Sequence, residues 1–235
     1  MTSRRLRASV RHRAFFAILA VLLLATRGSA EGPSTNALLA ETQRSSEDPN
    51  RLGLVWWMPR EFWEISLAAG PAPSTPEQIT AFTSVLGNYT LFAVADGVIG
   101  QFGGVTWISS EDLRSGVELQ DSSGTRYVAL AEDQVSPDAR NLAASMKPAL
   151  TNMLGPMGEH MEFFFFPSTS PNGRPIADAK ADGSFRFRVG KDFYDWRLPL
   201  GSILPKKVCP VDREELSGAW KYCPWHGKKL KSRRD

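Results

Sequence analysis

The residues best suited to chemistry in this 235-residue chain lie near its C-terminus. Cys209 and Cys223 are the only two cysteines, and His226, one of three histidines, follows the second cysteine by three positions. Thiolate sulfur and imidazole nitrogen both suit tetrahedral zinc, whereas two thiols held close together can instead form a disulfide. This stretch therefore predicts either a small metal centre or a covalent clasp.

The local sequence places each cysteine at the start of a short motif. Cys209-Pro-Val-Asp212 is followed, after ten residues, by Cys223-Pro-Trp-His226 and a glycine. Over residues 209–230 the chain resembles a zinc ribbon, a family in which two Cys-Pro-x-Cys knuckles bind one metal ion and a hairpin joins them. The resemblance implies four metal ligands: Cys209, Asp212, Cys223 and His226. A histidine can replace a thiolate, but an aspartate in a structural zinc site is uncommon and departs from the family pattern.

A disulfide between Cys209 and Cys223 is the competing interpretation. Ser217-Gly218 predicts the turn of a hairpin that brings the two cysteines together. Export to an oxidising compartment, inferred below, would favour their oxidation, and closing a loop of this size contributes on the order of 3 kcal/mol. Because of the export signal and Asp212, we favour a disulfide, or a hairpin without metal, over bound zinc.

Elsewhere in the chain, His160 is the one histidine that could serve catalysis. It lies between Glu159 and Glu162, and in an extended segment His160 and Glu162 share one side. Such a pair can bind a metal or exchange protons, although a histidine beside carboxylates is more commonly a hydrogen-bonded structural residue. A hydrolase or metal-dependent enzyme built on this chain would have to use His160 with Glu159 or Glu162.

Three tryptophans, Trp56, Trp57 and Trp63, fall within eight residues. Large aromatic side chains are usually well buried, so we favour a place in the core. An exposed aromatic platform for sugars or peptides is the alternative.

Residues 1–30 have the pattern of a secretory signal peptide. Five arginines precede an apolar run at 14–25, and the small residues of 28–30 follow it. The run is shorter than the roughly 20 residues that span a bilayer, so we expect cleavage near Glu31 and no transmembrane segment afterwards. The expected location is secreted or periplasmic, and Arg4-Arg5 leaves general secretory and twin-arginine export open.

Charge divides the remaining chain into two parts. Residues 205–235 carry nine basic and four acidic side chains, a net charge of +5, which leaves −8 on residues 31–204. An acidic body is a poor match for nucleic acid, so no nucleic-acid partner is expected. The basic tail suits a protein or envelope-surface partner instead.

The same division predicts the domain organisation. Residues 31–51 are polar and predict a flexible leader, residues 52–204 predict one folded domain, and residues 205–235 form the ribbon-like tail. Within the domain, a helix start at 74–78 and apolar spacing predict a helix of about three turns that is stopped by Gly87. A second helix is expected from Ser136 through to Gly155, kinked or divided by Pro148. A short helix is expected after Ser109.

Strand patterns fill most of the remaining domain. Asp96-Gly97 predicts a hairpin turn, and residues 117–120 and 126–130 predict a second hairpin. Four phenylalanines at 163–166 leave no polar face, so we expect a central strand covered on both sides. The pattern predicts an α+β fold on a mostly antiparallel sheet with two or three helices, plus the C-terminal hairpin.

Together these features predict an exported bacterial protein of unknown activity. We expect a binding or envelope-associated interaction module with a zinc-ribbon-like or disulfide-clasped tail. The alternative is the enzyme built on His160, and zinc in the tail is the only cofactor that the sequence suggests.

Overall fold

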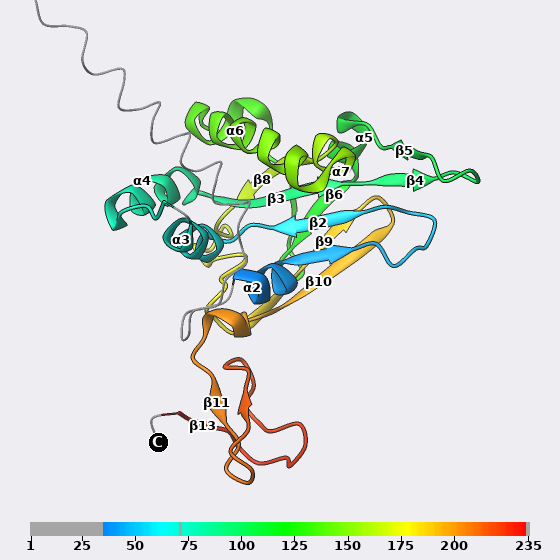
Figure 1. Cartoon of the computed structure of the whole chain (residues 1–235). Coiled ribbons are helices and arrows are strands. Elements are labelled where there is room, and N and C mark those ends of the chain that lie inside the picture. The colour runs from blue at the N-terminus through cyan, green and yellow to red at the C-terminus, as the bar shows by residue number, and fades with distance from the viewer. Residues whose placement is uncertain (1–34, 71, 234–235) are drawn as a thin grey trace, which may run out of the picture.

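The computed structural model describes residues 35–70 and 72–233, so the expected signal peptide lies outside the described residues. Two antiparallel sheets are stacked on each other, helices cover one side, and a small ribbon projects at the C-terminal end (Figure 1). The predicted α+β class is confirmed. In the part of the chain described, no helix combines the length and the apolar composition needed to cross a membrane.

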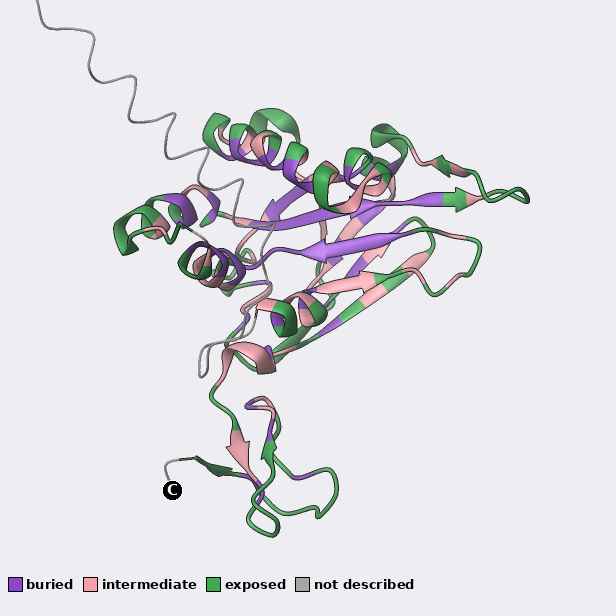
Figure 2. Cartoon of the chain, in the orientation of Figure 1, coloured by how far each residue is buried: buried purple, intermediate pink, exposed green. Residues whose placement is uncertain are grey.

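The first sheet has the strand order β1-β2-β3-β8, and all its pairings are antiparallel. Its strands are β1 (Gln43–Ser45), β2 (Leu54–Trp57), β3 (Tyr89–Ala95) and β8 (Glu162–Pro167). All four residues of β2 are buried, as are all residues of β3 after Tyr89 (Figure 2). A strand that is apolar on both faces must be covered on both faces, and the second sheet and the helices provide this cover.

The second sheet has the order β10-β9-β6-β7 and is also antiparallel. Its strands are β6 (Val117–Gln120), β7 (Arg126–Val128), β9 (Gly183–Val189) and β10 (Asp192–Leu198). Along β9 the buried residues Phe185, Phe187 and Val189 alternate with more exposed arginines. This alternation leaves one face of the sheet in solvent, as the sequence pattern predicts.

The core between the sheets is built from aromatic rings. Phe92 of β3 stacks on Phe187 of β9 with ring centroids 4.1 Å apart, and it also contacts Trp196 of β10. On the opposite face of the first sheet, Trp56 meets Phe62 of the helix α3 edge-to-face. The first sheet is therefore the middle layer of the domain.

The described residues form six α-helices and two 3-10 turns, and α3 packs on the outer face of the first sheet. They are α2 (Thr35–Thr42), α3 (Arg60–Ala69), α4 (Pro76–Leu86), α5 (Ser110–Gly116), α6 (Pro137–Leu154), α7 (Pro156–Glu159) and two 3-10 turns, η2 (Glu132–Gln134) and η3 (Gly201–Ile203). α4 begins at a capping box in which Thr75 and Gln78 satisfy each other's backbone N–H groups. α6 remains one helix with Pro148 inside it.

The segment predicted to be a flexible leader is folded from Thr35 onward, so that prediction is wrong for residues 35–51. The α2 side chain Leu38 is fully buried, and β1 pairs with β2. Glu41 accepts hydrogen bonds from the N–H groups of Gly201 (2.9 Å) and Ser202 (2.8 Å). A few well-placed contacts fix this segment although its composition is polar.

The hairpin predicted at Asp96-Gly97 is displaced along the chain. Gly97 exchanges backbone hydrogen bonds with Leu52, and buried Asp96 pairs with Arg51, so these residues extend the pairing of β3 instead of forming a turn. The hairpin joins β4 (Gly97–Ile99) to β5 (Val105–Trp107). Its turn lies at 100–104, where Gly103 has a φ of 80° that favours glycine.

The phenylalanine-rich strand β8 is covered on both faces, but it lies at the edge of its sheet and not at the centre. The outer edge of β8 is covered in part by the segment that follows β7, because the Leu130 N–H donates to the Phe165 carbonyl at 2.8 Å. Apolar composition therefore predicted the burial of β8 and not its position in the strand order.

Candidate metal centre

The C-terminal ribbon is a three-stranded antiparallel sheet with its own small core. β11 (Lys207–Val208) pairs with both β12 (Glu215–Leu216) and β13 (Lys231–Ser232). Its buried cluster consists of Cys209, Leu216, Cys223 and Leu230, and it is separate from the core of the domain (Figure 2). Half of this cluster is therefore made of the two cysteines.

The two cysteine motifs fold into equivalent knuckles. The Arg213 N–H donates to the Cys209 carbonyl at 3.0 Å, and the Gly227 N–H donates to the Cys223 carbonyl at 2.9 Å. Arg213 and Gly227 have positive φ angles of 67° and 61°. The fourth residue after each cysteine thus has the same left-handed conformation, so the knuckle at Asp212 has the same backbone form as the knuckle at His226.

The N–H groups of the cysteines extend this equivalence. The Cys209 N–H donates to the Glu214 carbonyl at 3.0 Å, and the Cys223 N–H donates to the Lys228 carbonyl at 2.8 Å. Arg213 is the only residue other than glycine with a positive φ in the described part of the chain. Such a conformation costs free energy in an arginine and persists where surrounding contacts fix it. Sequence reasoning missed this residue, although its alignment with Gly227 was a usable signal.

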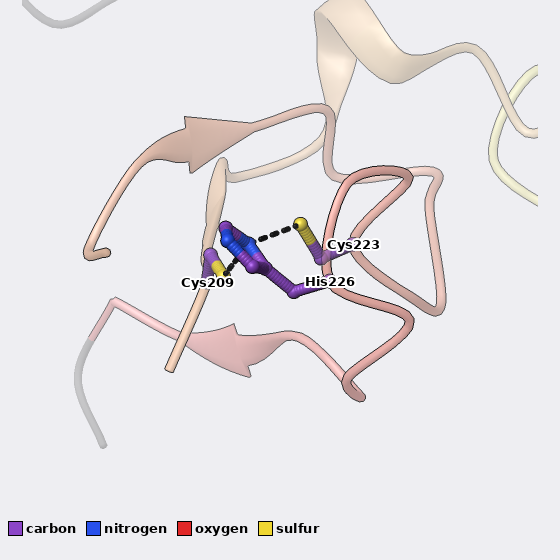
Figure 3. A group of neighbouring side chains, drawn as sticks. All are labelled: Cys209, Cys223 and His226. Atoms are coloured by element: carbon purple, nitrogen blue, oxygen red, sulfur yellow. Dashed lines mark hydrogen bonds between the residues drawn. The ribbon is translucent and has the colours of Figure 1, made fainter. Parts of the chain in front are cut away.

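The side chains of Cys209, Cys223 and His226 converge between the knuckles (Figure 3). Their ligand atoms lie within 4.8 Å of one another, and His226 Nδ1 is 3.4 Å from each sulfur. Zinc bonds of about 2.3 Å to sulfur and about 2.0 Å to nitrogen, at a tetrahedral angle, separate each sulfur from the nitrogen by about 3.5 Å. The Cys-Cys-His group therefore has the composition and spacing to hold a metal ion.

Asp212 lies beside this group in the position equivalent to His226. Its Oδ2 atom is 3.7 Å from His226 Nδ1, and its Oδ1 atom accepts a hydrogen bond from the Glu214 N–H at 3.1 Å. That bond is the main cause of a lowered pKa at Asp212, and interactions with Cys209 and His226 lower it further. The carboxylate is thus ionised and lies beside His226, but it is not one of the three residues whose ligand atoms all converge within 4.8 Å.

The two thiols differ in their readiness to ionise. Burial raises the pKa of Cys209. Hydrogen bonds from the backbone of Asp212 and Val211 oppose this rise, whereas side-chain hydrogen bonds with Asp212 and Cys223 add to it. Burial also opposes ionisation of Cys223, but the N–H and side chain of His226, with further hydrogen bonds, outweigh it and lower the Cys223 pKa. Cys223 is consequently the better initial donor, since metal binding needs the thiolate form.

The favoured disulfide is not present in this structure. Cys209 and Cys223 are both free thiols, and His226 lies in contact with both sulfurs. The hairpin brings the cysteines together as predicted, but their sulfurs are not bonded to each other. His226 lies against both sulfurs, so the three side chains form a group of potential metal ligands.

The body residues proposed for catalysis do not form such a group. His160 is exposed and stacks on Trp107, with ring centroids 4.9 Å apart, while Glu162 pairs with Lys147 at 2.9 Å. Among the described residues, the only cluster of three or more potential metal ligands is the one in the tail. His160 and Glu162 therefore have different partners, and Glu159 is exposed at the end of α7.

The three neighbouring tryptophans form part of the core, as the favoured interpretation predicted. The alternative prediction of an exposed aromatic platform is wrong. Trp56, Trp57 and Trp63 are each no more than 4 % exposed. Trp57 and Trp63 contribute to the wall of a cavity of about 410 Å³ between α3, α4 and the segment after β8. Their rings belong to the packing of β2 and α3 and do not form a surface.

Comparison of the chain with protein-family models, with curated proteins and with solved structures finds no match.

Proposed function

We propose that the C-terminal ribbon binds one zinc ion and serves as the metal-stabilised interaction module of an exported protein. The observation that carries this proposal is the position of His226 Nδ1, 3.4 Å from both Cys209 Sγ and Cys223 Sγ, between two equivalent knuckles. Asp212 would supply the fourth ligand. Thiolate and imidazole donors in a tetrahedral arrangement favour zinc over hard cations such as magnesium or calcium.

The role of the metal would be structural. A site with four protein ligands leaves no open position for a substrate, whereas catalytic zinc sites keep one. The ribbon has short strands and a buried cluster of only four residues, which is too little apolar surface to stabilise a fold of this size. The free energy of metal binding would therefore supply much of the stability of the ribbon.

Two observations support an interaction role for the ribbon. It is packed around a core of its own, and its net charge of +5 contrasts with −8 on residues 31–204. Zinc would not change this contrast, because two thiolates neutralise one divalent ion. Export would bring the module to the cell envelope or beyond, as the N-terminal sequence pattern predicts.

Metal analysis together with thiol counting tests this proposal. Protein purified from its native compartment should contain one zinc ion per chain, and two thiols should react only after a chelator is added. Cys223→Ser and His226→Ala should abolish stoichiometric zinc binding, while His160→Ala serves as the matched histidine control and should retain it. Absence of zinc combined with absence of free thiols in the denatured protein would establish the disulfide instead.

A further inference from the structure

Several large side chains on the ribbon are exposed although the ribbon is small. Trp225, within the Cys223 knuckle, is 72 % exposed, and Tyr222, which precedes the knuckle, is 62 % exposed. Tyr222 lies directly opposite Lys229 in an antiparallel bridge. The next residues on the two strands, Cys223 and Leu230, are buried, so Tyr222 and Lys229 lie on the outer side, away from the metal centre.

Positive charge is concentrated on the same segment. Lys228, Lys229 and Lys231 are exposed, and within residues 35–70 and 72–233 no ion pair involves them. By contrast, Lys206 pairs with Glu215, and Lys221 pairs with Asp182 of the domain. We refer to the exposed residues Tyr222, Trp225, Lys228, Lys229 and Lys231 of this segment as the aromatic-basic surface, although only Tyr222 and Lys229 are placed on the same side by the bridge.

We propose that the aromatic-basic surface docks the protein on an anionic lipid bilayer. Tryptophan and tyrosine rings are favoured at the headgroup level of a membrane, and neighbouring lysines are attracted to lipid phosphates. The proposal rests on the proposed function, because the metal-held knuckle positions Tyr222, Trp225 and Lys228 on one segment.

The shape and charge of the molecule favour this partner over a small ligand. The ribbon that carries the surface projects from the domain (Figure 1), and the cavity of about 410 Å³ lies on the domain, with no residue of the ribbon in its wall. The acidic body would be repelled by an anionic membrane, whereas the basic ribbon would be attracted. This asymmetry orients the protein with the ribbon towards the lipid.

Vesicle co-sedimentation of the zinc-loaded chain beginning at Glu31 tests the inference. Starting at Glu31 excludes the apolar run at 14–25, which could itself enter lipid. Binding is expected to vesicles of phosphatidylcholine with phosphatidylglycerol, to be absent with phosphatidylcholine alone, and to weaken at high salt. Because each surface lysine contributes about fivefold to binding, Lys228→Gln, Lys229→Gln and Lys231→Gln together should weaken binding on the order of a hundredfold.

Matched substitutions on the body control for charge and apolar character. Arg126→Gln, Lys191→Gln and Arg197→Gln remove the same charge from exposed body residues and should leave binding almost unchanged. Trp225→Ser should weaken binding several-fold, whereas Phe102→Ser, at a fully exposed body phenylalanine, should not. An equal loss in the body variants would overturn the assignment of the surface.

The remaining outcomes separate this inference from the proposed function. If metal analysis confirms zinc but the protein does not bind anionic vesicles, the lipid inference is wrong and the zinc ribbon stands. Binding to heparin or a single-stranded oligonucleotide without binding to vesicles would identify a soluble polyanion as the partner. That result would contradict the inference that the partner is a lipid bilayer. Unchanged vesicle binding by metal-free Cys223→Ser protein would show that the ordered ribbon is not required, which also contradicts the inference.

Discussion

Asp212 Oδ2 lies 3.7 Å from His226 Nδ1, and the two residues occupy equivalent positions in the two knuckles. Asp212 is the proposed fourth ligand of a zinc ion, so its substitution tests the site directly. Asp212→Ala should reduce zinc affinity by on the order of tenfold or more, and Asp212→Cys should increase it, because thiolate is a stronger zinc donor. Competition with a chromophoric chelator measures both changes.

Glu214 provides the control for Asp212 in the same knuckle. Its side chain is exposed, and its backbone contributes the knuckle hydrogen bonds. Glu214→Ala should therefore leave zinc affinity nearly unchanged. Equal affinities of the wild-type protein and Asp212→Ala would exclude Asp212 as a ligand.

Removal of the metal should unfold the ribbon and leave the domain folded. The ribbon core of four residues is separate from the domain core, so loss of the metal affects only the smaller cluster. Trypsin should then cut at the lysines of 221–231, while residues 35–204 remain protected. Trypsin should cut the Cys209→Ser protein at the same lysines even without a chelator. If the wild-type ribbon resists trypsin equally before and after chelation, a structural metal is excluded.

Glu41 anchors the N-terminal segment through the N–H groups of Gly201 and Ser202. Glu41→Ala removes a charged acceptor from both groups and should lower the free energy of unfolding by about 1–3 kcal/mol. Chemical denaturation measures this change, with Glu47→Ala as the control at an exposed position of the same segment. If the two variants are equally stable, the anchor contributes little.

Phe92 joins the two sheets through its stacking on Phe187 and its contact with Trp196. Phe92→Ala should lower the free energy of unfolding by about 3–5 kcal/mol, because it leaves a cavity between the sheets. Phe193 of β10 is largely exposed, and Phe193→Ala should change stability by about 0.5 kcal/mol or less. Similar losses in both variants would contradict the location of the core.

Tyr194 gives the domain a pH-dependent stability at alkaline pH. Burial, together with the charges of Asp192 and Asp96, raises its pKa from 10.0 to about 12. Below pH 10 the phenol is protonated in folded and unfolded chains, so its contribution is complete. Between pH 10 and pH 12 the unfolded chain loses this proton first, so the free energy of unfolding falls as pH rises.

Tyr194→Phe should remove this part of the alkaline loss of stability. Denaturation at a series of pH values measures it, and Tyr222→Phe is the control at an exposed tyrosine. An unchanged slope between pH 10 and pH 12 in Tyr194→Phe would show that Tyr194 does not cause the loss.

Local patterns in the sequence determined much of the secondary structure. Thr75 and Gln78 specify the start of α4, and the alternation along β9 specifies which face is buried. The spacing of the two cysteine motifs likewise predicted that they would meet, because each motif forms a tight turn by itself. These features depend on residues close in sequence, whose geometry the local backbone sets.

Only the tertiary structure decided the partners of these elements. Asp96 and Gly97 had the composition of a turn, but pairing with Arg51 and Leu52 kept them extended. The phenylalanines of β8 predicted burial equally well for an edge or a central strand. His226 lies against both sulfurs because contacts distant in sequence bring the two knuckles together, and the free energy of such long-range contacts cannot be obtained from local propensity.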